Sequence, residues 1–147
     1  MTSQSQKILD ACTSGDVAAL QQLFEANKIQ NSGPVYGISA SGPPSVNSMI
    51  STAITYGHVD VVSLILRTYS GRGVQFTGET IEALLYHPDL EILQILYEYD
   101  PSVVSYEWDS HTDTFITKAC EQPPKKITPL LLWLIEHDAD LEGGYFP

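Results

Sequence analysis

The chain repeats one short pattern four times along its 147 residues. Each copy joins a small or polar turn to a stretch whose apolar residues recur every three positions, as Val59, Val62 and Ile65 do. That spacing predicts an apolar stripe along one helix face. A further helical stretch precedes each turn, so we expect an all-α protein built from stacked helix pairs. The four turn-and-helix copies are 15–24, 57–66, 88–97 and 126–135.

The second copy carries the clearest family signal. The letters GHVDVV at 57–62, followed by LIL at 64–66, resemble the signature turn and second helix of the ankyrin repeat. The turn at 14–16 matches the same region, and 137–140 resembles the family's closing hairpin segment. The family's Thr-Pro-Leu-His opening of the first helix is absent. The resemblance implies an ankyrin-like solenoid in which each repeat is a helix, a tight turn and a second helix.

The spacing of the copies indicates irregular loop insertions. Their turns are separated by 42, 31 and 38 residues, whereas an ankyrin repeat has a period of about 33. We expect a single domain over residues 1–147. The four repeats are expected at roughly 5–30, 47–75, 79–105 and 113–143.

The charge of the chain excludes some classes of partner. Seven basic and eighteen acidic side chains give a net charge of −11. Sequence-independent binding to nucleic acid needs clustered lysines and arginines, so no nucleic-acid partner is expected. Adhesion to an anionic membrane surface is disfavoured as well, because it also depends on clustered basic side chains. The net charge instead predicts a basic partner.

The polar N-terminal residues, the short apolar runs and the two cysteines predict the cellular location of the protein. Residues 1–7 are polar, and the longest apolar run, 130–135, is far shorter than the roughly 20 residues of a membrane span. Cys12 and Cys120 match no zinc or redox spacing, so we interpret them as partly buried thiols in a reducing compartment. These features predict a cytoplasmic protein, with the nucleus as the alternative, and they indicate no metal and no cofactor.

The insertion at 31–46 is crowded with Gly, Pro and Ser, which predicts an extended loop. It is either a tolerated loop or a recognition finger that uses Tyr36.

The segment 102–115 concentrates aromatic side chains and groups capable of proton transfer. In an extended conformation Asp109, His111 and Asp113 share one face, where they would serve as acid and base groups. A solvated polar hairpin is the simpler alternative, and a metal site has no supporting motif.

Tyrosines lie at the ends of helices, where Tyr56 and Tyr86 are expected to line one concave surface. Packing into the core at a helix end is the simpler alternative for any one of them. Tyrosine offers area, rigidity and a hydroxyl group at low entropic cost. The expected binding residues are Tyr36, Tyr56, Tyr86, Tyr106 and Trp108.

The resemblance implies a structural role for His58, which would hold neighbouring turns together by hydrogen bonding. The last copy is more apolar than a terminal repeat should be. We therefore expect a second subunit to cover Leu132 and Trp133 in a homodimer, or the C-terminal tail to pack there. Further repeats beyond the chain are the remaining alternative.

Two functions fit these features. The favoured one is a binding module that holds a protein partner through its concave face and inserted loops. The alternative is a small-molecule-binding protein or a cofactor-free enzyme of the cyclase, isomerase or dehydratase type. Its pocket would lie between the 31–46 loop and the 102–115 segment.

Overall fold

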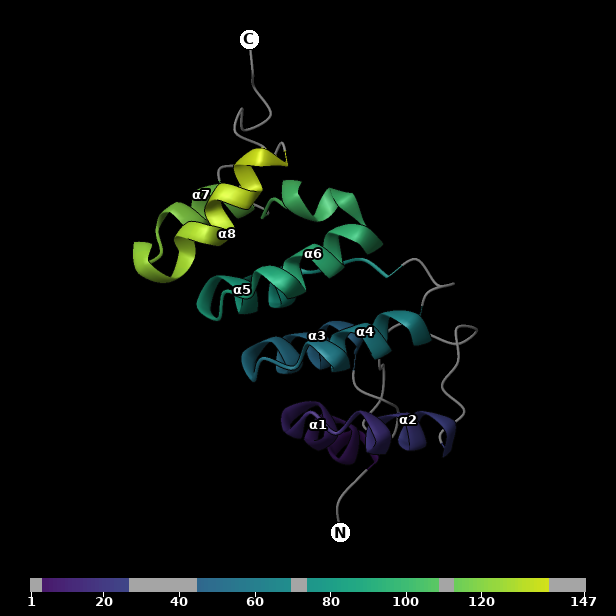
Figure 1. Cartoon of the computed structure of the whole chain (residues 1–147). Helices are drawn as coiled ribbons and strands as arrows, with labels where there is room; N and C mark the ends of the chain where they lie inside the picture. The colour runs from purple at the N-terminus through teal and green to yellow at the C-terminus, as the bar shows by residue number, and fades with distance from the viewer. Residues whose placement is uncertain (1–3, 27–44, 70–73, 109–112, 138–147) are drawn as a thin grey trace.

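The computed structural model describes residues 4–26, 45–69, 74–108 and 113–137. These residues are mainly helical, and their one extended pairing is a single antiparallel bridge between Glu107 and Thr114. The expected all-α class is confirmed (Figure 1). The helices are α1 Gln4–Ser14, α2 Val17–Ala26, α3 Val46–Thr55, α4 Val59–Thr68, α5 Gly78–Tyr86, α6 Leu90–Tyr99, the 3-10 helix η1 Pro101–Ser105, α7 Phe115–Cys120 and α8 Pro124–Glu136.

The helices form two layers. The first helices of the pairs, α1, α3, α5 and α7, contact one another in that order, and so do the second helices α2, α4, α6 and α8. Within the pairs, α1 contacts α2, α3 contacts α4 and α7 contacts α8. Figure 1 shows the result as a stack that begins with α1 and α2 and ends with α7 and α8.

One apolar core runs through the whole stack. Ile8 of α1, Ile50 of α3, Ile81 of α5 and Phe115 of α7 are all fully buried. Burial of such a side chain contributes about 1.5–3 kcal/mol. Because each pair buries its apolar face only against its neighbours, stability depends on the stacking.

Acidic residues begin three of the second helices. Asp16 and Asp89 each accept the backbone N–H three residues later, at 3.0 and 3.1 Å, and so cap α2 and α6. Asp60 lies two positions past the N-cap residue His58, within the first turn of α4. There its charge interacts favourably with the positive end of the helix dipole.

Asn47 of α3 holds the start of α5 in place. Its side-chain Nδ2 donates to the carbonyl oxygen of Gln75 at 2.9 Å. Its Oδ1 accepts the backbone N–H of Thr77 at 3.0 Å and the hydroxyl of the buried Thr80. One amide therefore joins two consecutive first helices.

Two predictions about the inserted loop and the cysteines are wrong. Val46, expected to end the loop, is the first residue of α3 and is buried. The Ser45 hydroxyl caps that helix by accepting the backbone N–H of Ser48 at 3.0 Å, so helix formation begins earlier than expected. The cysteines are not alike: Cys12 is buried in the core, whereas Cys120 is exposed.

The predicted position of Trp133 on the outer face is also wrong. Only 8% of this residue is exposed, because its ring packs edge-on against Tyr97 of α6, with centroids 5.2 Å apart. The ring of His137 stacks on the Trp133 ring at 3.8 Å, and Tyr97 lies edge-on to His137 as well, at 5.2 Å. Leu132, in contrast, is 55% exposed. The previous helix pair thus covers Trp133, and a homodimer surface on α8 would have to use Leu132 without it.

Along the ranges that the structure describes, no helix combines the length and the apolar content needed to cross a membrane.

Candidate functional site

An open groove of about 480 Å³ lies across the turns of three consecutive helix pairs. The end of α3, the turn from α5 to α6 and the first turn of α8 each contribute to it. Its lining residues are Ile54, Thr55, Tyr56, Gly57, Tyr86, His87, Pro88, Asp89 and Lys126.

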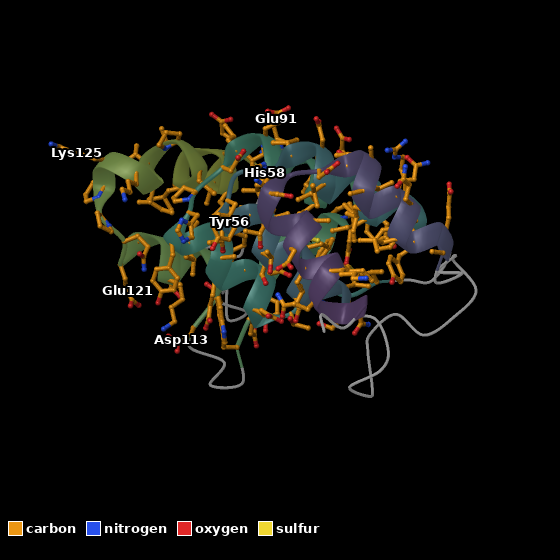
Figure 2. The ribbon with its side chains drawn as sticks, turned by 90° about the horizontal axis from the view of Figure 1, so that it is seen from below. Tyr56, His58, Glu91, Asp113, Glu121 and Lys125 are labelled. Carbon is orange, nitrogen blue, oxygen red and sulfur yellow. The ribbon has the colours of Figure 1, made fainter. Side chains whose placement is uncertain are left out.

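Two tyrosines supply the largest exposed surfaces in this groove. Tyr56 is 56% exposed and Tyr86 is 64% exposed. Each follows the last buried residue of its helix, Ile54 or Leu85, so its ring projects beyond the core instead of packing into it. Figure 2 shows Tyr56 close to His58, at the turn between α3 and α4. The expectation that Tyr56 and Tyr86 line one surface agrees with this groove.

One end of the groove is electropositive despite the negative net charge. Lys125 and Lys126 both lie in the first turn of α8, where the positive end of the helix dipole disfavours cations. No carboxylate in the described ranges forms an ion pair with Lys126. Both helix dipole and ammonium group therefore favour an anion at this end. Figure 2 shows Lys125 at the outer edge of α8.

Asp89 brings a negative charge to the groove at the turn between α5 and α6. One of its carboxylate oxygens is occupied by the backbone N–H of Ile92, as described above. The groove therefore presents two aromatic rings, a carboxylate and an ammonium group that has no ion-pair partner within the described ranges. Such a surface can bind a ligand through aromatic contacts and ion pairs. It therefore resembles a recognition site more than an enclosed active-site pocket.

Tyr106 and Trp108 lie elsewhere. Their rings meet edge-on with centroids 4.7 Å apart. Both cover Gly78 so closely that a Cβ there would come within 3.2 Å of the Tyr106 hydroxyl and 3.0 Å of the Trp108 Nε1. Gly78 begins α5 and Tyr86 ends it. Eight helical steps separate these residues by about 12 Å, so the structure does not bring Tyr106 and Trp108 to the groove.

The candidate acid and base residues are only partly within the described ranges. Asp109 and His111 lie outside them, as do Tyr36 and residues 31–44 of the insertion. Asp113 is described: its carboxylate forms an ion pair with Lys118 at 3.9 Å. In Figure 2 it lies at an edge of the stack, away from Tyr56.

The chain around Asp113 is paired as a hairpin would be. The backbone N–H of Trp108 donates to the Asp113 carbonyl at 2.8 Å, and that of Phe115 donates to the Tyr106 carbonyl at 2.9 Å. This pairing agrees with the simpler interpretation of the segment, a polar hairpin. Among the described residues, no group of three or more His, Cys, Asp and Glu side chains is arranged to hold a metal ion.

A second groove, of about 390 Å³, was not anticipated from the sequence. It lies between α4 and α6, with Arg67 and Glu98 beside an apolar floor that includes Leu66 and Ile95. Tyr99 also lines it, but its hydroxyl donates to the Tyr69 carbonyl at 3.3 Å and so has a structural partner.

Of the groove-lining residues, sequence reasoning named only Tyr56 and Tyr86 as binding residues, so it missed the polar residues His87, Asp89 and Lys126. The signal for Lys126 is present in the sequence, because adjacent lysines at a helix start oppose the helix dipole. No equivalent signal distinguishes His87.

A comparison of the chain with protein-family models found no match, and a comparison with curated proteins also found none.

Proposed function

We propose that the chain is an ankyrin-like binding module whose groove, lined by Tyr56, Tyr86 and Lys126, receives a linear segment of a partner protein. One observation carries this proposal. Two tyrosines from consecutive helix pairs are more than half exposed over the same open groove. Large exposed aromatic rings are typical of interface anchors, because each buries much area for little loss of side-chain entropy.

The stacked helix pairs support the ankyrin-like assignment. Contacts pass from each pair to the next in both layers. Gly15 and Gly57, which lead from first to second helices, both adopt a φ of +76°. An array of this kind presents its turns along one edge, so residues from several repeats contact a single extended ligand.

The enzyme alternative gains no support from the described residues. Of its three acid and base candidates, Asp113 is paired with Lys118, and the other two lie outside the described ranges. The groove is open to solvent, whereas acid–base chemistry is favoured by a site that excludes water.

Selection from a displayed library of random 15-residue peptides tests the proposal. The wild-type chain is the target, and the double variant Tyr56→Ala/Tyr86→Ala is the counter-target. We expect the enriched peptides to bind the double variant at least about tenfold more weakly, because each truncation removes an anchor worth 1 kcal/mol or more. Circular dichroism and urea unfolding establish that the variant folds.

A matched variant controls for the loss of exposed side chains in general. Gln21→Ala and Gln94→Ala change exposed residues of α2 and α6 outside the groove lining, and we expect them to leave binding unchanged. Peptides that bind the double variant as well as the wild type would contradict the proposal. A selection that enriches no peptide would contradict it equally.

A further inference from the structure

We propose that the bound segment is a proline-rich peptide in the polyproline II conformation, with two prolines three residues apart and an acidic residue three residues beyond them. The prolines would pack on Tyr56 and Tyr86, and the acidic side chain would meet Lys126. This inference rests on the proposed function and adds the class of ligand that the groove recognises.

The spacing of the tyrosines carries the first step. Tyr56 is the C-cap residue of α3 and Tyr86 is the last residue of α5. These two helices pack directly against each other, and packed helices lie about 8–10 Å apart. A polyproline II helix advances about 3.1 Å per residue, or about 9 Å in three residues. Prolines at positions i and i+3 therefore match the step from one tyrosine to the next.

The shape and chemistry of the groove carry the second step. The groove is open and spans three helix pairs, so it suits an extended ligand better than a compact one. Polyproline II has no internal hydrogen bonds, which leaves its carbonyl groups free to accept from the tyrosine hydroxyls. Aromatic-lined grooves favour such peptides because the ligand is already ordered before it binds.

The charges of the groove carry the third step. Lys126 lies on α8, the helix that packs next to α6. Because Lys126 lines the same groove as Tyr86, we place the acidic residue three positions beyond the second proline, toward its ammonium group. Asp89 lies on the same helix pair as Tyr86 and disfavours an acidic residue at that position of the peptide.

Fluorescence anisotropy with short labelled peptides tests this inference. The test peptide reads Pro-Gln-Gln-Pro-Gln-Gln-Asp. One control peptide moves the prolines to positions i and i+2, and another replaces both by alanine. We expect each control peptide to bind at least about tenfold more weakly, because only one ring or none is then matched. We expect a comparable loss of affinity for the test peptide with Tyr56→Ala or Tyr86→Ala.

Charge reversal tests the contact with Lys126 separately. We expect Lys126→Glu to weaken binding of the test peptide and to strengthen binding of a peptide that ends in lysine instead of aspartate. Because Lys126 is exposed on the first turn of α8, this substitution leaves the core intact. The same substitution at Lys125, which does not line the groove, is the matched control and should have the smaller effect.

The outcomes separate this inference from the proposed function. If the library yields peptides that depend on Tyr56 and Tyr86 but lack prolines three residues apart, the proline inference is wrong and the proposed function stands. The same holds if the test peptide binds no better than its alanine control. If peptide binding is indifferent to both tyrosines, the groove is not the binding surface and both proposals fail.

Discussion

The imidazole Nε2 of His58 lies 2.9 Å from the main-chain carbonyl oxygen of Thr13. His58 opens α4, whereas Thr13 lies in the last turn of α1, so one hydrogen bond links the turns of two consecutive helix pairs. The expected structural role of His58 is confirmed. The imidazole also fills the space above Gly15, where a Cβ would come 2.6 Å from Nδ1. Glycine at position 15 thus permits the positive φ of the turn and also leaves room for the imidazole of His58.

Substitution of each turn glycine by alanine distinguishes the backbone role of glycine from its contact with His58. Gly15 and Gly57 share a φ of +76°, but only Gly15 has a close neighbour, because nothing lies within 4 Å of a Cβ at Gly57. We expect Gly57→Ala to lower the free energy of unfolding by about 1–2 kcal/mol through backbone strain alone. Gly15→Ala should cost more, because the methyl group also displaces His58.

A double-mutant cycle measured by urea unfolding checks this explanation. In a His58→Ala background, Gly15→Ala should cost no more than Gly57→Ala does. Equal costs of the two glycine substitutions in the wild-type background would show that the imidazole does not occupy the space above Gly15.

The side-chain amide of Asn47 is expected to be important for the joint between α3 and α5. Asn47→Ala removes three hydrogen bonds at once, each worth about 0.5–1.5 kcal/mol, so we expect a loss of about 2–4 kcal/mol in the free energy of unfolding. Asn47→Asp keeps the acceptor oxygen and loses the donor to Gln75, and it should cost less. A loss below 0.5 kcal/mol for Asn47→Ala, on the order of a surface substitution, would contradict this role.

Neighbouring apolar residues of α8 should differ in their effect on stability. Trp133 is buried, so we expect Trp133→Ala to cost about 3–5 kcal/mol. Leu132 is exposed, so Leu132→Ala should change stability by no more than about 0.5 kcal/mol. Thermal and urea unfolding measure both values, and similar losses for the two variants would place Leu132 in the core.

A homodimer formed through α8 would use Leu132 at its interface, because Trp133 is buried. Sedimentation velocity of the wild type and of Leu132→Glu tests it. A dimer that Leu132→Glu dissociates would support the prediction, since a charge at an exposed apolar contact is costly to bury. A wild-type monomer at the highest accessible concentration would refute it.

The thiol of Cys12 should make stability depend on pH in the alkaline range. Burial raises its pKa to about 12, whereas an unfolded thiol has an ordinary pKa of about 8.5. Between these values the folded state holds a proton that the unfolded state releases, so stability falls as the pH rises above about 8.5.

Urea unfolding of the wild type and Cys12→Ala at several pH values isolates this effect. Other titrating groups are common to both proteins and cancel in the comparison. We expect the wild type to lose up to about 1.4 kcal/mol per pH unit more than the variant over this range. Parallel pH profiles would mean that the Cys12 thiol ionises in the folded protein as it does in the unfolded one.

Local patterns were sufficient to predict most of the helices. The period that placed Val62 and Ile65 on one face is matched by their complete burial, because a helix with an apolar stripe can bury it in only one orientation. The high apolar content of the last copy predicts an outer position for both Leu132 and Trp133, and for Trp133 this prediction is wrong. Its spacing of six and three residues from the buried Ile127 and Leu130 places it on the buried side of α8. The period within one helix is here more informative than the apolar content of the whole copy.

The sequence by itself determined the helical class and the helix caps at Asp16 and Asp89, because each depends on residues within a few positions of one another. Only the tertiary structure decided which helix ends meet. Tyr56, Tyr86 and Lys126 are distant in sequence and line one groove, whereas Tyr106 lies at the opposite end of α5. The offset between stacked pairs is set by packing over the whole core, and no local pattern specifies it.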